Sequence, residues 1–143
     1  MEFTVPDLLG DLGLDGLTLL RALAAAFMAI LFGQSGLDKV VDYAGNKAWL
    51  TGHFADSPLA GTVPILLPLI TLLETAAGLF SAVGVVMLLW SGRPDWAFWG
   101  MLLSALSLVF LFFGQRMAKD YAGGATLVPY FILSLVGLGL LMG

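Results

Sequence analysis

The sequence predicts an all-α integral membrane protein: a four-helix bundle with a short interfacial helix in its first loop. Two observations support this fold class, a mean hydropathy of +0.97 with only 11% charged residues, and four separate apolar segments. A soluble globule of 143 residues would have more surface than six basic and ten acidic side chains could cover. The lipid bilayer is therefore the expected solvent.

Each apolar segment approaches or exceeds the length that a helix needs to cross the membrane, about 20 residues for roughly 30 Å of hydrocarbon. These segments must be helical in lipid, because backbone groups find no water there to bond. The predicted spans are residues 17–36, 63–90, 96–114 and 125–142. We expect one domain over residues 17–143, preceded by an acidic tail over residues 1–16.

The first connection, residues 37–62, is the only one expected to have room for structure of its own. Apolar residues recur in it at helical spacing, with Tyr43 and Trp49 nearby. The recurring residues are Val40, Val41, Ala44 and Ala48. This pattern predicts a short helix at the level of the lipid head groups, with an ordinary extramembrane loop as the alternative.

The distribution of basic residues predicts the orientation in the membrane. Four spans place the first and third connections on one side and both termini on the other. Residues 91–95 are expected to be a tight turn and residues 115–124 a short polar loop. The first and third connections carry Lys39, Lys47, Arg116 and Lys119, against Arg93 and at most Arg21 on the other side. Because cytoplasmic loops are rich in Lys and Arg, we expect these two connections in the cytoplasm and both termini outside.

Glu74 is the most informative residue, because it places a carboxyl group inside the second predicted span (ITLLETAAGLF). Such a group is unfavourable in lipid unless it is protonated, paired or hydrated, so it suggests a functional site. From the side of the first connection, Glu74 lies about ten residues, roughly 15 Å, into its helix, and Arg21 lies about fifteen residues, roughly 22 Å, from the end of the first. We therefore predict that Arg21 and Glu74 face each other. The pair would line a head-group or proton site, or would only fix the helix register.

Two polar clusters are expected on one face of the bundle, where the first span ends (FGQSGLDKV) and where the third ends (FGQRMAKDY). Their main residues are Gln34, Asp38, Lys39, Gln115, Arg116 and Lys119. Together they could form a polar mouth that suits a quinone head group or a small anion. The alternative is a charged rim that only anchors the helices.

Several kinds of chemistry have no support in the sequence. The chain contains no cysteine, so a dithiol relay, a disulfide framework and an iron–sulfur cluster are excluded. A single histidine cannot provide bis-histidine haem ligation, so we expect no metal site and interpret His53 as a solvated loop residue. The sequence contains no basic run, which argues against nucleic acid as a partner. We assign no catalytic residue and no intrinsic cofactor.

Several runs of this sequence match motifs of a known family. These are Arg21 at the head of the first span, the run FGQSGLDKV, the segment LLPLITLLETAAGLFSAVGV with Glu74 and Gly78, and FGQRMAKDYAGGA. From about Leu20 onward the chain thereby resembles the DoxX family of small four-helix bacterial membrane proteins. The resemblance implies a multi-pass protein of the bacterial cytoplasmic (inner) membrane. It also implies links to quinone-dependent oxidoreductases, which work with a second subunit.

Three functions remain open from the sequence. The first is a membrane component of a quinone-linked oxidoreductase system, in which Arg21, Glu74 and the two glutamine-bearing clusters shape a head-group pocket. The second is a non-catalytic scaffold or assembly subunit that holds a partner enzyme or forms a homo-oligomer. The third is a carrier for a small solute or a proton that uses Glu74. The absence of a redox-active side chain argues against a complete oxidoreductase in this chain alone.

Overall fold

The computed structural model describes residue 8 and residues 10–143, and within that part the chain forms helices and no strand. Half of the predicted acidic tail, residues 1–7 and 9, lies outside the described residues. The long helices are α2 (Gly16–Val41), α4 (Val63–Ser91), α5 (Asp95–Met117) and α7 (Val128–Met142), with the short helices α3 (Tyr43–His53) and α6 (Tyr121–Thr126). The model thus contains 4 helical spans that are long and apolar enough to cross a membrane, with α6 and α7 together forming the last. The predicted all-α four-helix membrane bundle is confirmed.

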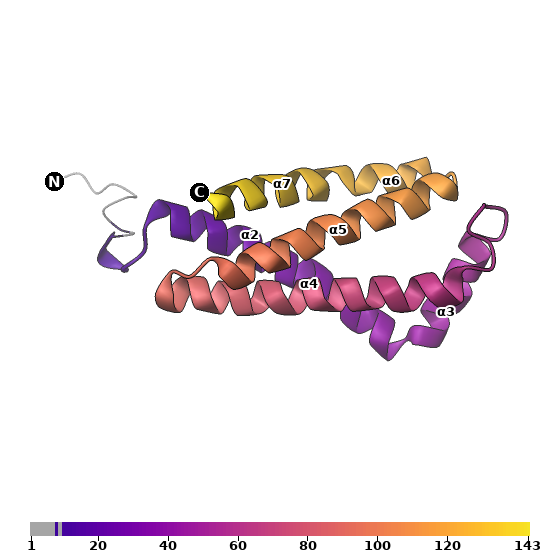
Figure 1. Ribbon diagram of the computed structural model, residues 1–143, viewed down its shortest axis with the longest axis horizontal. Coiled ribbons are helices and arrows are strands. Elements are labelled where there is room, and N and C mark those ends of the chain that lie inside the picture. Colours follow the sequence, from indigo (N-terminus) through magenta and orange to yellow (C-terminus); the bar gives the residue numbers. More distant parts are fainter. Residues whose placement is uncertain (1–7, 9) are drawn as a thin grey trace.

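The helices run antiparallel to their neighbours along the chain, so that the connections alternate between the two ends of the bundle. Figure 1 shows α3 and α6 at one end, and the carboxyl terminus with the turn between α4 and α5 at the other. Helix α4 packs against α2 and α5, while α7 packs mainly on α5. Many large apolar side chains point outward, such as Ile30 and Ile65, each 74% exposed. In a membrane protein these side chains meet lipid.

Local sequence signals explain where the helices begin and end. The Asp15 carboxylate caps α2 by accepting a hydrogen bond from the backbone nitrogen of Thr18 at 2.6 Å, and this bond lowers the pKa of Asp15. Asp42 follows α2 directly and caps α3 in turn, accepting from the backbone nitrogen of Gly45. Helix α4 ends at Gly92, whose φ of 72° is readily adopted only by glycine. Pro129, which lacks a backbone N–H, stands in the first turn of α7.

Two connections differ from the sequence prediction. Residues 115–124 are not a polar loop, because α5 continues to Met117 and α6 begins at Tyr121. The first long helix also extends to Val41, past the predicted end at residue 36. In both places helical hydrogen bonding continues after the apolar pattern stops, because polar residues are compatible with helix outside the hydrocarbon. The first connection does contain a helix, α3, but this helix begins at Tyr43. Val40 and Val41 of the predicted pattern therefore belong to α2, and only Ala44 and Ala48 lie in α3.

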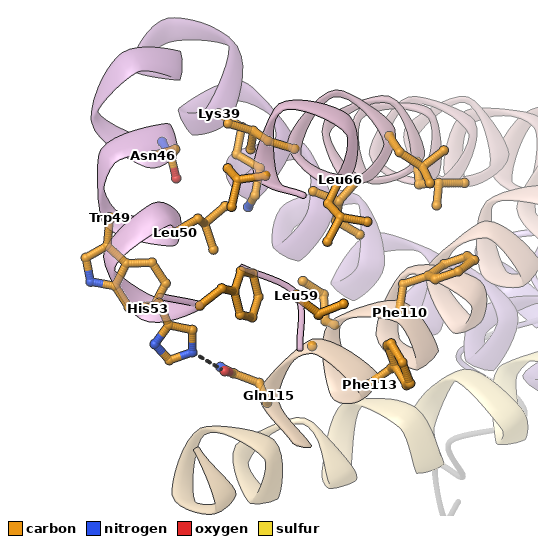
Figure 2. Close-up of a pocket in the computed structure, with 18 of the residues that line it drawn as sticks. Lys39, Asn46, Trp49, Leu50, His53, Leu59, Leu66, Phe110, Phe113 and Gln115 are labelled. Atoms are coloured by element: carbon orange, nitrogen blue, oxygen red, sulfur yellow. Dashed lines mark hydrogen bonds between the residues drawn. The ribbon is translucent and has the colours of Figure 1, made fainter. Parts of the chain in front are cut away.

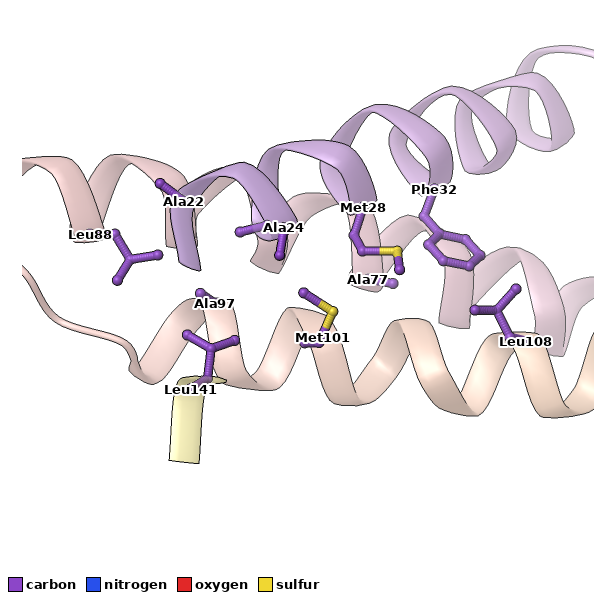
Figure 3. Packing of buried hydrophobic residues seen from close by; sticks show 11 residues of the cluster. Ala22, Ala24, Met28, Phe32, Ala77, Leu88, Ala97, Met101, Leu108 and Leu141 are labelled. Atoms are coloured by element: carbon purple, nitrogen blue, oxygen red, sulfur yellow. The ribbon is translucent and has the colours of Figure 1, made fainter. Parts of the chain in front are cut away.

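The buried core lies where α2, α4 and α5 meet. It combines small alanines with a few large side chains, among them Met28, Phe32, Met101 and Leu108, which are 2% exposed or less. Figure 3 shows these side chains between the helices, with Leu141 of α7 at one edge. Small residues allow the helix backbones to approach closely, which is the main source of packing energy between helices in lipid.

Two glycines fix the register of α2 against α4. A Cβ added to Gly78 of α4 would lie 2.5 Å from the backbone nitrogen of Gly33, and one added to Gly36 would lie 2.9 Å from the Cα of Thr75. These are distances at which backbone would have to move. The level of Gly36 on α2 is therefore the level of Thr75 on α4.

We predict that Gly78→Ala destabilises the bundle by about 1–3 kcal/mol, because the added methyl group would push α2 away from α4. The matched control is Gly139→Ala on α7, where a Cβ would meet nothing within 4 Å. The control should be neutral or slightly stabilising, since alanine favours helix over glycine. Unfolding of both variants in detergent, followed by circular dichroism, checks this. Equal stability of the two variants would contradict the close approach.

Candidate ligand-binding pocket

A cavity of about 350 Å³ lies at the end of the bundle that carries α3. Its walls come from the end of α2, from α3 and the loop after it, and from α4, α5 and Leu127. The polar groups among the lining residues are Lys39, Asn46, His53 and Gln115. Most of the other lining residues are aliphatic or aromatic, and Figure 2 shows several of them around the space. A mostly apolar cavity with a few polar groups is typical of a small-molecule site.

His53, at the end of α3, contacts the end of α5 at this pocket. Its Nε2 lies 2.7 Å from Oε1 of Gln115 (Figure 2) and 3.7 Å from Oδ2 of Asp120, and its ring stacks on Trp49 with centroids 4.6 Å apart. The His53 side chain is only 17% exposed. The interpretation of His53 as a solvated loop residue was therefore wrong, because the fold of the connections brings Gln115 and Asp120 to it.

Lys39 lines the pocket and forms an ion pair with the buried Glu74. Nζ of Lys39 lies 2.7 Å from Oε2 of Glu74, whose side chain is 2% exposed. Ser35 completes the group, because its hydroxyl donates to Glu74 at 3.1 Å and accepts from Lys39 at 2.9 Å. Lys39 lies in the last turn of α2, yet its side chain extends toward the interior of the bundle. The pair satisfies the requirement that a carboxylate in lipid be paired and hydrogen-bonded.

The predicted pairing of Arg21 with Glu74 does not form. Arg21 instead donates from Nε to the carbonyl oxygen of Leu140 at 2.7 Å, where it meets one of the free carbonyls at the end of α7. The prediction placed the end of the first span level with the start of the second. Because Gly36 lies level with Thr75, Arg21 is about fifteen residues, or roughly 22 Å, from the level of Glu74. Lys39, on the extended last turn of α2, takes its place.

Only two of the six residues of the predicted polar mouth line the pocket, and the other four lie elsewhere. Lys39 and Gln115 line the pocket. Asp38 accepts a hydrogen bond from Nδ2 of Asn46 at 3.3 Å, and the guanidinium of Arg116 lies 4.4 Å from the ring centre of Tyr121. Gln34 and Lys119 are exposed and do not belong to the described lining.

The sequence analysis missed one face of α3 as part of the site. Asn46, Trp49, Leu50 and His53 all line the pocket, and their spacing is the one that repeats along one side of a helix. This spacing was visible in the sequence. The prediction used only the apolar residues Val40, Val41, Ala44 and Ala48, which indicated a helix at the level of the lipid head groups, and it did not consider the face with Asn46 and His53.

The pocket walls are close to electrically neutral, because Glu74 balances the charge of Lys39. Among the described residues, no group of three or more His, Cys, Asp or Glu side chains could hold a metal ion. The arrangement can therefore hold a planar, mostly apolar molecule between aromatic side chains and offer hydrogen bonds to its polar edge.

Comparisons of this chain with protein-family models, with curated proteins and with solved structures found no match. The fold and the pocket alone define its class: an integral membrane protein of four helical spans with an apolar pocket at one end of the bundle.

We predict that Lys39→Met destabilises the protein by about 3–5 kcal/mol, because it leaves the Glu74 carboxylate buried without a partner. The double variant Lys39→Met/Glu74→Leu should regain most of this loss, since an apolar pair of similar volume needs no charge compensation. Unfolding in detergent checks both variants. A double variant as unstable as the single one would show that the charge pairing is not the cause.

We also predict that Gln115→Leu loosens α3 by about 1 kcal/mol, because His53 then loses its hydrogen-bond partner on α5. Amide hydrogen exchange should become faster over Tyr43–His53 and stay unchanged in α7. Thr126→Ala, which removes a hydroxyl that bonds only within α6, is the control. Unchanged exchange in α3 of the Gln115 variant would contradict the role of this contact.

Proposed function

We propose that the pocket binds the head group of a membrane quinone, and that this chain is a DoxX-like membrane component of a quinone-linked oxidoreductase system. One observation carries the proposal: an apolar cavity of about 350 Å³ with a single charged lining residue, Lys39, whose charge Glu74 balances. A volume of this size lies at the small end of ligand pockets. It suits one ring with short substituents.

The polar edge of a quinone consists of carbonyl oxygens, which only accept hydrogen bonds. Lys39 carries three N–H donors, of which Glu74 and Ser35 take two. The remaining donor is available to a carbonyl oxygen in the pocket. Trp49 and Phe54 line the same space and offer aromatic faces to a ring.

Charge compensation favours a neutral quinone over the small anion that the sequence also allowed. An anion would need a positive charge that is not already paired, and the only lysine in the lining has its carboxylate partner at 2.7 Å. A neutral ring needs only hydrogen bonds and apolar contact. The pocket thus matches the chemistry of a quinone better than that of an anion.

A bound quinone would supply a two-electron, two-proton carrier to the system. This chain has no cysteine, so a dithiol relay is not available in it, and we assign the electron donor to a partner oxidoreductase subunit. The chain's own residues would then hold the ring, donate a hydrogen bond from Lys39 and exclude water.

The basic residues of the first and third connections support the orientation predicted from the sequence, with these connections in the cytoplasm. We propose that the pocket end, with Lys47 and Arg116, faces the cytoplasm of a bacterial cell and that the chain resides in the inner membrane. A partner enzyme would then reach the pocket end from the cytoplasm.

Quenching of tryptophan fluorescence tests the proposal, because Trp49 lines the pocket while Trp90, Trp96 and Trp99 lie at the opposite end of α4 and α5. We expect titration with a decyl-tailed benzoquinone, in lipid nanodiscs, to quench part of the emission in a saturable way. Trp49→Phe should remove the saturable part. Trp90→Phe, which changes a residue 87% exposed at the far end, should keep it.

Quenching that rises linearly with quinone and is the same in both variants would overturn the proposal. In that case a protein that copurifies with the chain, in the absence of a bound small molecule, would favour the alternative of a scaffold or assembly subunit.

A further inference from the structure

The pocket is lined on the side of the first connection by packed side chains around Phe54 and by Trp49 of α3, which is 61% exposed. Phe54, only 8% exposed, packs with Val63 and Leu67 of α4, and Leu50 and Leu59 lie against the same cluster. The contact between His53 and Gln115 ties the end of α3 to α5. A molecule that entered from water at this end would have to pass Trp49 and the side chains packed around Phe54.

The pocket also reaches the outer surface of α4 and α5. Leu69 of α4 and Phe110 and Phe113 of α5 line it, yet they are 45%, 50% and 52% exposed. Leu69 lies about six residues, or roughly 9 Å, into α4, and Phe110 about seven residues, or roughly 10 Å, before the end of α5. All three residues lie inside the apolar spans predicted from the sequence, residues 63–90 and 96–114, so in a membrane their exposed side chains face hydrocarbon.

The packing of α4 and α5 explains why they leave an opening at this end. Toward the other end the helices are in close contact, because a Cβ on Gly84 would lie 2.5 Å from the Cα of Ala97. Toward the pocket end they diverge in Figure 1, where the lining residues Leu69 and Phe110 are large. Beside the cavity α4 and α5 carry mainly bulky side chains, with Gly114 as their one glycine in the lining.

We infer that the ligand of this pocket is an amphiphile with a long hydrophobic tail, which enters laterally from the bilayer between α4 and α5. This inference rests on the proposed function and adds the route by which the quinone reaches the pocket. The head group lies toward Lys39 and His53, and the tail leaves between Leu69 and the two phenylalanines. The tail stays in hydrocarbon throughout, so entry needs no transfer of apolar surface through water.

Photolabelling tests this path directly. The probes are decyl-tailed benzoquinones in nanodiscs, one with a diazirine on the tail and one with an azide on the ring. We expect the tail probe to label residues 66–73 and 110–113, and the ring probe to label α2 and α3 near Lys39 and Trp49. Excess unlabelled decyl-tailed benzoquinone should reduce both labels by about tenfold if the sites are saturable.

Two variants narrow the opening and two matched controls do not. Leu69→Trp and Phe110→Trp place a larger ring at the opening, so the ring label should accumulate about tenfold more slowly after mixing, as expected for an obstructed entry path. Leu72→Trp and Leu106→Trp change exposed residues of the same two helices that do not belong to the described lining. In these controls the ring label should accumulate as fast as in the unchanged protein.

The outcomes separate this inference from the proposed function. Lateral entry would be overturned, and the quinone site would remain, if excess quinone removes the ring label but the tail labels α3. The same conclusion would follow if the ring label accumulates at an unchanged rate in both narrowed variants. Ring labelling that excess quinone does not reduce would overturn the quinone site itself.

Discussion

The carboxylate of Glu74 sets the constraint on which the pocket end of the bundle depends. A charged group 1% exposed inside a membrane helix needs an opposite charge, and Lys39 provides it from the last turn of α2. This requirement draws the lysine inward and holds the end of α2 against α4. Lys39 is also part of the pocket wall. The Lys39–Glu74 pair that stabilises the helix contact therefore gives the pocket a polar group without a net charge.

Close backbone contact places the pair correctly. Gly36 and Gly78 allow α2 to approach α4 until their backbones nearly touch, and this contact fixes which residues share a level. One turn of slippage along the helix would move a side chain by about 5.4 Å, which is more than an ion pair tolerates. The small residues of the core and the ion pair therefore specify the same register. Toward the end of the bundle that carries α3, bulky residues of α4 and α5 line the cavity.

The sequence predicted the spans well and the pairing within the bundle poorly. Apolar segments of sufficient length must be helical in lipid, because backbone groups find no water there to bond. A helix in the first connection was also predicted, although two of the residues that indicated it, Val40 and Val41, belong to α2. The partner of Glu74 was wrong because hydropathy marks where a span leaves the hydrocarbon, whereas α2 continues to Val41. Register depends on close contacts such as that of Gly36 with Thr75, which no one-dimensional pattern contains. His53 was misread for the same reason, since its partner Gln115 is distant in sequence.

Native mass spectrometry of the gently extracted protein tests most directly whether the pocket beside Lys39 and Glu74 holds a quinone. The account predicts an adduct of one quinone mass per chain, lost on the addition of excess decyl-tailed benzoquinone. It also predicts a weaker adduct in Glu74→Gln, where the lysine loses its charged partner. A chain that carries only phospholipid, in the same amount with and without this substitution, would contradict it.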